Sequence, residues 1–388
     1  MTSAYNNTWI YNLAVAKEAK KWRKHGYIEQ EQLTTIQQSY QAPFYHPNFT
    51  IRILLFIAAL FASSGITGFF TLMVADTGRD FISFACIVYG VASFFVLEKI
   101  FIAKNHFKSG VTEAILYHSC GFVIGGIGGL SDFNNVHGIL FVCLMVFSFS
   151  AFRYLDLLCT IAATLVLAGI LFFEFYSLGG FFQQIIPFVF IIVFTPLYFI
   201  VKFLQKRDGL KLWHNNLLIV ESISLLLIYA GGNYLVVREL SVAMLGLAIQ
   251  DGEDIPFAFI FYTLTILIPI VYLYFGVKKK DIVLVRVSLL VVAFSAFTFK
   301  YYFSLGHPEI TLTIAGIILI GIAIGVMHYL KIPRNGFTRE NLLSEKWGSM
   351  NVQAFMISQT MGGNQPGVDQ SSMPGGGSFG GGGSTNDF

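Results

Sequence analysis

Charged residues are scarce in this chain. Asp, Glu, Lys and Arg together make up 12% of its 388 residues, whereas an ordinary soluble domain contains about 25%. Hydrophobic residues make up 55% of the sequence. This balance, together with the apolar runs described below, excludes the two or three soluble domains that the length alone would suggest.

Cysteine is rare, and familiar catalytic motifs are missing. The cysteines all fall inside apolar runs, and none has a CxxC or Cys/His spacing of the kind that holds zinc. They are Cys86, Cys120, Cys143 and Cys159. HExxH, GxSxG and the phosphate-binding loop motif are also absent. These absences favour a protein that is not an enzyme, and we expect neither a metal nor another cofactor.

Long apolar runs dominate what is present. They recur between Ile51 and Leu330, many of them about 20 residues long, which is the length that a helix needs to cross a bilayer. We therefore predict an all-α polytopic membrane protein with about ten transmembrane helices, in contact with the lipid bilayer. The predicted spans are 51–74, 81–102, 112–130, 136–152, 155–175, 182–203, 214–235, 256–277, 282–299 and 309–331.

The predicted organisation has three parts. A cytosolic helical hairpin (1–50) precedes the transmembrane domain (51–331), and a cytosolic, largely disordered, glycine-rich tail (332–388) follows it. Because the hairpin region is polar and basic, we expect no cleavable signal peptide, and the first span itself is expected to direct insertion.

Lysine and arginine follow the alternation of the spans. When the ten spans are laid out in order, all but three of the 25 lysines and arginines fall on the side that carries both ends of the chain. The exceptions are Arg79, Arg238 and Lys300. Since positive residues are enriched in cytoplasmic loops, both termini are predicted to be cytoplasmic. Basic residues spread in this way indicate topology, and we expect no nucleic-acid partner.

The two polar ends each allow two interpretations. The basic cluster between Lys17 and Lys24 suits either a packed cytosolic hairpin that touches lipid, which we favour, or an amphipathic helix lying on anionic lipid. The tail is a spacer or a docking peptide. Both ends are candidate contacts for a membrane or cytosolic protein partner.

The start of the chain resembles a known group of proteins. The segment Trp22-Arg23-Lys24-His25-Gly26-Tyr27-Ile28, followed by a Glu/Gln-rich stretch and many spans, is similar to bacterial predicted multi-pass membrane proteins of unknown function. These have an N-terminal Trp…Gly-x-Ile…Glu-Gln helical hairpin, and glycine-rich tails occur on various bacterial membrane proteins. The resemblance implies the inner membrane of a bacterium and carries over no activity or site residue.

Glu221 is the strongest candidate for a functional residue. It lies about two turns into the span 214–235, with His214 seven residues before it on the same side and Ser224 on the same face. Ionisable groups inside spans are costly and usually face a bundle interior or an aqueous cavity. The functional interpretation of Glu221 is a proton-binding or cation-binding site. The alternative is a buried carboxyl that is neutral or hydrogen-bonded to a neighbouring helix.

Small residues separate two acids along one predicted face of the span 112–130. In steps of three or four residues, this face runs through Glu113, Tyr117, Gly121, Gly125, Gly128 and Asp132. Small residues let helices approach closely, and we favour this packing role over a polar path across the membrane. His118 lies off the face and is expected to be a satisfied core histidine.

Three further features are weaker evidence for a functional site. Asp156 is expected to pair with Arg153 three residues before it. Pro187, Pro196 and Pro269 are expected to kink their spans, although the sequence contains no repeat of two matching halves of the kind that marks many transporters. Residues 240–250 are expected to form an interfacial or re-entrant helix, or a ligand lid.

These observations favour a membrane-embedded interaction or assembly component, because charged groups are sparse in the spans and polar segments lie at both ends. The alternative is a secondary transporter or proton-coupled permease that uses Glu221 and the face between Glu113 and Asp132. A membrane enzyme acting on lipid-linked substrates ranks third. An ordered, water-filled cavity that reaches Glu221 would favour transport, whereas a dry, tightly packed centre with an apolar lateral groove would favour interaction.

Overall fold

The computed structural model describes residues 3–74, 76–245 and 254–302, together with isolated positions between 313 and 328. Apart from a single bridge between Tyr45 and His106, these residues form helices and the connections between them, with no strand. The protein is an all-α polytopic membrane protein.

Nine helices in the described part are long and apolar enough to cross a membrane. They are α3 (Phe49–Val74), α4 (Arg79–Val96) with its π-helical continuation η1 (Leu97–Ile102), α5 (Val111–Leu130), α6 (Val136–Tyr154), α7 (Leu157–Leu178), α9 (Ile186–Leu204), α10 (His214–Gly232), α12 (Ala258–Lys279) and α13 (Ile282–Tyr302). The shorter helices are α1 (Asn7–Lys24), α2 (Gln30–Ser39), α8 (Phe181–Gln184), the 3-10 helix η2 (Asp208–Trp213) and α11 (Tyr234–Leu245).

The first nine predicted spans agree with these helices to within a few residues. The predicted tenth span, 309–331, falls outside the described residues except for isolated positions, and so does the tail. Of the predicted segment 240–250, residues 240–245 belong to α11, and the remainder lies outside the described part.

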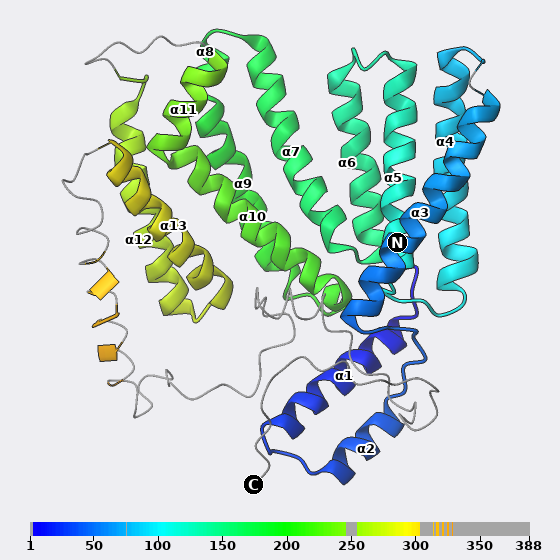
Figure 1. The fold of residues 1–388 in the computed structure, drawn as a ribbon. Helices are drawn as coiled ribbons and strands as arrows, with labels where there is room; N and C mark the ends of the chain where they lie inside the picture. The colour runs from blue at the N-terminus through cyan, green and yellow to red at the C-terminus, as the bar shows by residue number, and fades with distance from the viewer. Residues whose placement is uncertain are drawn as a thin grey trace.

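Two of the spanning helices lie inside the bundle. Half of the apolar stretch of α5 and 56% of that of α10 is buried, against 33% or less in the other seven spans. Helices α3, α4 and α6 pack around α5, whereas α7, α9, α12 and α13 pack around α10. Helix α7 joins the two groups, because it packs against both α6 and α10 (Figure 1).

The connections lie alternately at two faces of the bundle. We call the end that carries α1, α2 and the connections α4–α5, α6–α7, α9–α10 and α12–α13 the N-terminal face (Figure 1). The other end is the opposite face. Arg79, Arg238 and Lys300 all lie at the opposite face, at the start of α4, in α11 and near the end of α13. For the residues that the structure describes, the charge asymmetry of the sequence is therefore an asymmetry between these two faces.

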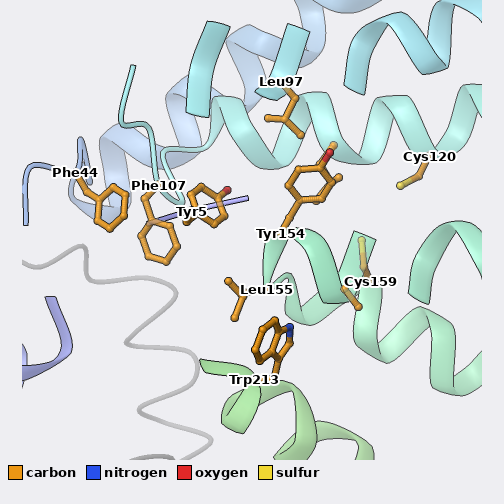
Figure 2. Close-up of a cluster of buried hydrophobic side chains, with 11 residues drawn as sticks. Tyr5, Phe44, Leu97, Phe107, Cys120, Tyr154, Leu155, Cys159 and Trp213 are labelled. Atoms are coloured by element: carbon orange, nitrogen blue, oxygen red, sulfur yellow. The ribbon is translucent and has the colours of Figure 1, made fainter. Parts of the chain in front are cut away.

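The N-terminal segment is packed onto the N-terminal face. The Ala4 amide donates to the carbonyl of Arg153 at 2.8 Å. The ring of Tyr5 meets that of Phe107 edge-on at 4.9 Å, and Phe44 stacks on Phe107 at the same distance. Figure 2 shows these three rings together, with Trp213 of η2 in the same buried cluster. The hairpin of α1 and α2 is thus attached to the bundle by the residues just before α1 and just after α2.

Candidate functional site

A buried ionic network lies between α9, α10 and the α12–α13 connection. Glu221 of α10 is completely buried, and its Oε1 lies 2.6 Å from the Nζ of Lys202 on α9. The same ammonium group lies 2.6 Å from Oδ2 of Asp281. Gln205 Nε2 donates to the other oxygen of Glu221 at 2.7 Å. We call Lys202, Glu221 and Asp281 the ionic network.

Local structure explains how each member is placed. Lys202 lies in the last turn of α9, and Asp281 follows Lys280, whose positive φ of 54° ends α12. Asp281 Oδ1 accepts from the amides of Val283 and Leu284 at 3.1 and 3.2 Å. Asp281 therefore caps α13 with one oxygen and contacts Lys202 with the other. An acidic cap at a helix N-terminus is favourable in its own right.

The ionic network borders an open cleft at the N-terminal face. The cleft has a volume of about 650 Å³. Its lining residues are Tyr198, Phe199, Lys202, Phe203, Gln205, Lys206, His214, Leu218, Lys279, Lys280, Asp281, Ile282 and Val283. Glu221 itself does not line the cleft but lies directly behind Lys202. We call this feature the basic cleft, because four lysines and one acid face it.

The predicted neighbours of Glu221 are placed differently from one another. His214, the first residue of α10, is half-buried and lines the basic cleft. Ser224 is buried and donates to the carbonyl of Val220 in its own helix at 2.7 Å. The structure thus brings His214 to the cleft, while the Ser224 hydroxyl is used within α10.

Glu113 has a structural environment at the N-terminal face. It is buried, and its Oε1 pairs with the guanidinium of Arg52. Its Oε2 accepts from the Gly110 amide at 2.8 Å and from the Thr112 hydroxyl at 2.9 Å. The carboxylate therefore holds the start of α5 and ties it to the start of α3.

Tyr117 and Asp156 are joined, which corrects the expected pairing of Asp156 with Arg153. The Tyr117 hydroxyl donates to Asp156 Oδ2 at 3.0 Å, and Asp156 caps α7 by accepting from the Cys159 amide at 2.8 Å. Arg153 instead donates from Nε to Glu98 at 2.8 Å and from Nη2 at 3.1 Å. The prediction was wrong because the start of α7 takes up the acid and η1 offers Arg153 a two-pronged partner.

The predicted polar face of span three does not continue to Asp132. Helix α5 ends at Leu130, and Asp132 lies in the following turn with a φ of 55°. It pairs with Arg79 at the opposite face, half-exposed. Glu113 and Asp132 therefore belong to separate ion pairs at the two ends of α5, and each holds α5 to a neighbouring element.

The glycines of α5 divide between two surfaces. A Cβ atom at Gly126 would lie 2.6 Å from the Ser83 carbonyl oxygen of α4, so this glycine allows the two helices to touch. Gly121 and Gly125, which were predicted to pack, have no atom within 4 Å of a Cβ position. They line a lateral cleft of about 550 Å³ between α3, α4 and α5.

His118 lies at this lateral cleft and differs from its expectation. Its ring packs on Tyr89 and Phe122, with centroids 5.6 and 4.5 Å away. Its Nε2 is buried and has no hydrogen-bond partner in the part of the chain that the structure describes. The histidine is therefore held by aromatic contacts and is not the satisfied core residue that was predicted.

Lys202 and Asp281 are the residues that sequence reasoning missed. Both lie next to predicted span ends, where charges usually act as topology signals or reach the interface. The sequence did contain a signal for Lys202. A carboxylate inside a span, here Glu221, needs a partner, and the preceding predicted span, 182–203, has Lys202 at its end. Helices α9 and α10 are antiparallel neighbours, so their ends are the first place to search.

Within the described residues, no group of three or more His, Cys, Asp or Glu side chains could hold a metal ion. No protein-family model, no curated protein and no solved structure matches this chain. The chemistry of the ionic network and the basic cleft therefore carries the functional argument.

Proposed function

We propose that the protein is a secondary transporter that couples the movement of an anionic molecule to proton binding at Glu221. The observation that carries this proposal is the contact between a fully buried carboxylate and a lysine that faces an open cleft. The face between Glu113 and Asp132, which the transport hypothesis included at first, has no part in it, because both acids belong to other ion pairs.

The cost of the ionic network supports a functional role. Removing a charge from water costs several kcal/mol per ion, and an apolar core of the same size is often as stable. Within membrane spans, charged residues are accordingly rare and mark pathways and relays. Here one lysine compensates two acids, so the network depends on Lys202 remaining in place.

A simple exchange of partners gives the coupling. An anion that enters the basic cleft competes with Glu221 and Asp281 for the Lys202 ammonium. Once Lys202 turns to the anion, Glu221 is left without a compensating charge in a buried position. A carboxyl in such surroundings binds a proton in preference to remaining charged. Anion binding and uptake of one proton thus occur together.

The helices around the ionic network contain interior prolines. Pro196 lies in α9 six residues before Lys202, and Pro269 lies in the middle of α12. Proline removes a backbone hydrogen bond and bends a helix. Both helices are continuous through their prolines. Proline within a span is one of the features found near the binding sites of many transporters, and both helices pack against α10, which carries Glu221.

The test is proton movement in proteoliposomes that contain an internal pH indicator. Anions are added one at a time: carboxylates, phosphate, phosphate esters and anionic amphiphiles. At least one is expected to acidify the interior as it enters, and E221Q is expected to abolish the acidification while the anion still binds. A wild-type protein that moves no protons with any of them would overturn the proposal, and so would unchanged coupling in E221Q.

E174Q is the matched control. Glu174 also lies in a spanning helix, but it is half-exposed and pairs with His137 at 2.6 Å near the opposite face. The substitution removes the same charge far from the ionic network and is expected to leave proton coupling unchanged. Both variants are first compared with the wild type by size-exclusion chromatography, so that loss of coupling is not loss of fold.

A second candidate function, a membrane-embedded interaction or assembly component, is favoured by the fixed hairpin. Because the hairpin of α1 and α2 is attached to the bundle just before α1 and just after α2, its exposed polar surface is held near the N-terminal face. Arg23 and Lys24 are exposed there. A stoichiometric partner that co-purifies with the wild type and is lost from R23E/K24E would support this function, and homogeneous protein alone in both preparations would contradict it.

A further inference from the structure

The chemistry of the basic cleft points to its ligand. We propose that the cleft binds the phosphate headgroup of an anionic phospholipid drawn from the leaflet that it faces. This inference rests on the proposed function, since it names the class of anion that the transporter takes.

The charge of the cleft selects an anion. Lys206, Lys279 and Lys280 are exposed at its rim, in addition to Lys202, and Asp281 is the only acid among the lining residues. Counted together, the cleft and the ionic network behind it contain four lysines and two carboxylates among the described residues, which gives this region a positive formal charge. Basic pockets between spanning helices at a membrane face are suited to phosphate headgroups.

The position of the cleft selects a lipid over a soluble anion. The cleft lies at the level where α9 and α12 end and α13 begins, which is the level of the headgroups in a bilayer. A soluble anion would need only the basic rim. Of the apolar residues in the wall, Leu218 and Val283 belong to the core around α10, whereas Ile282 is 41% exposed and offers an apolar contact that a lipid would use and a soluble anion would not.

Aromatic side chains continue the cleft toward the lipid. Phe199 and Phe203 line it and are each 58% exposed on α9, on the surface that meets the acyl chains. Arg207 lies over the Phe203 ring at 4.8 Å. A molecule with a charged head and an apolar chain is complementary to a basic rim that leads directly onto exposed aromatic rings.

The size of the cleft agrees with this ligand. A volume of about 650 Å³ is within the range of sites that enclose a whole ligand of moderate size. An isolated phosphate ion would occupy only a small part of it. A phosphodiester with its glycerol backbone fits the space, with the phosphate oxygens near the lysines and the acyl chains outside along Phe199 and Phe203.

The experiment measures lipid binding by native mass spectrometry of the full chain. Phosphatidylglycerol is titrated against phosphatidylcholine, and bound lipid is counted. The variant K206Q/K279Q/K280Q keeps Lys202 and the ionic network. Each lysine near a phosphate contributes about 1 kcal/mol, so the three together are expected to strengthen binding roughly a hundredfold. The wild type should bind phosphatidylglycerol selectively, and the triple variant should lose this preference.

The matched control is K24Q/K99Q/K104Q. These three lysines are also exposed at or near the N-terminal face, but none of them lines the basic cleft. The control loses the same total charge and is expected to retain selective binding. Equal loss in both variants would show general attraction between a basic surface and anionic lipid, and would overturn the proposal.

Two further arms separate the sources of phosphate and the two proposals. Glycerol 3-phosphate carries the headgroup chemistry without acyl chains, and it should compete only weakly. Competition at the affinity of the lipid would identify a soluble substrate and overturn the lipid proposal, leaving proton coupling intact. E221Q should still bind phosphatidylglycerol. A wild type that binds this lipid selectively but moves no protons would support the site and refute the coupling alone.

Discussion

Lys202 compensates two carboxylates that differ in their access to water. The Glu221 side chain is completely buried, whereas that of Asp281 is 14% exposed and also accepts from two backbone amides. Asp281 therefore has other partners when the lysine moves away. Among the residues that the structure describes, Glu221 has Gln205 as its one polar side-chain partner besides Lys202, so we expect its protonation to respond to the lysine.

A half-buried histidine, His46, lies where the N-terminal segment meets the α4–α5 connection. Nδ1 of His46 is 3.0 Å from the carbonyl oxygen of Phe107, so this nitrogen carries the proton and donates it. Burial has the largest effect and lowers the pKa of His46 below its usual value. The hydrogen bond to the Phe107 carbonyl raises this pKa in part, Arg52 and Lys108 lower it again, and Glu113 raises it least.

We predict that acid loosens this contact. Since the pKa of His46 is lower in the folded segment than the usual value of about 6.5, the unfolded segment binds the proton more tightly. The stabilisation is therefore complete above about pH 6.5 and is lost as the pH falls toward the folded pKa. Hydrogen exchange at the Tyr45 and Phe107 amides, which bond across this junction, should report more frequent opening at acid pH after correction for the intrinsic rate.

His106 has to be separated from His46 in this measurement. Its ring lies 4.9 Å from that of Tyr45, and burial lowers its pKa in the same direction. H46N keeps a donor but does not titrate, so it should lose most of the pH response. H25N, at an exposed position, should keep it. A full pH response in H46N would assign the effect to His106 and contradict the prediction.

At the level of single residues, the sequence could identify a buried carboxyl but not its partners. Glu221 stood out because one charge among apolar neighbours is visible in a linear pattern. Its connection to Lys202 depends on how far α9 and α10 overlap, and to Asp281 on where α12 ends. Both contacts depend on how the helices pack in three dimensions, so they cannot be predicted from the residue pattern of a single helix.

Among the helices, α4 and α5 are held together by close backbone contact. Gly126 and Gly90 both lie at this contact, where a Cβ atom would come within 2.9 Å of a backbone nitrogen of the other helix. Small residues permit this approach, and the resulting van der Waals contact stabilises a helix pair that has no hydrophobic effect to drive it within lipid.

We predict opposite effects for alanine at two glycines of α5. G126A places a methyl group against backbone atoms of Ser83 and Ile87 that cannot move without shifting α4. Overpacking of this kind costs about 1–3 kcal/mol. G121A adds a methyl group in open space and raises helix propensity by up to about 1 kcal/mol. Thermal unfolding in detergent should show a lower midpoint for G126A and an unchanged or higher one for G121A.

The pair also tests the division of the glycines. The two substitutions change the same atoms in the same helix, so propensity and composition cancel in the comparison. Equal destabilisation by both would mean that Gly121 is packed, and would restore the face that the sequence predicted. In the sequence, every pair of glycines spaced four residues apart looks equally suited to a helix contact. Only the position of α4 decides which set makes the contact.

For the molecule as a whole, the spans were the most predictable feature. A stretch of apolar residues long enough to cross a bilayer is a local property, and nine such helices lie close to where the sequence placed them. The two internal helices, α5 and α10, are also the two with the lowest mean hydropathy of the nine, so their inner position left a signal in the sequence. Which helices pack around each of them was not predictable, because that depends on contacts between helices that no single span records.

We predict that the N-terminal face is cytoplasmic, since the lysines and arginines favour it. Ser39 at the end of α2 and Thr77 between α3 and α4 are exposed at the two faces. In intact cells, a membrane-impermeant maleimide should label T77C and leave S39C unlabelled until the membrane is opened. The reverse labelling pattern would mean that the N-terminal face is extracellular, and it would place the basic cleft at the outer leaflet.

The attachment of the N-terminal segment has a consequence for the order of events during synthesis. Ala4 bonds to Arg153, and α1 packs against η2, which ends at Trp213. Helix α1 therefore cannot make all of its contacts until the chain has been made through residue 213. Closing such a distant contact is slow compared with forming a local one. We therefore expect the N-terminal segment to dock well after it has been synthesised.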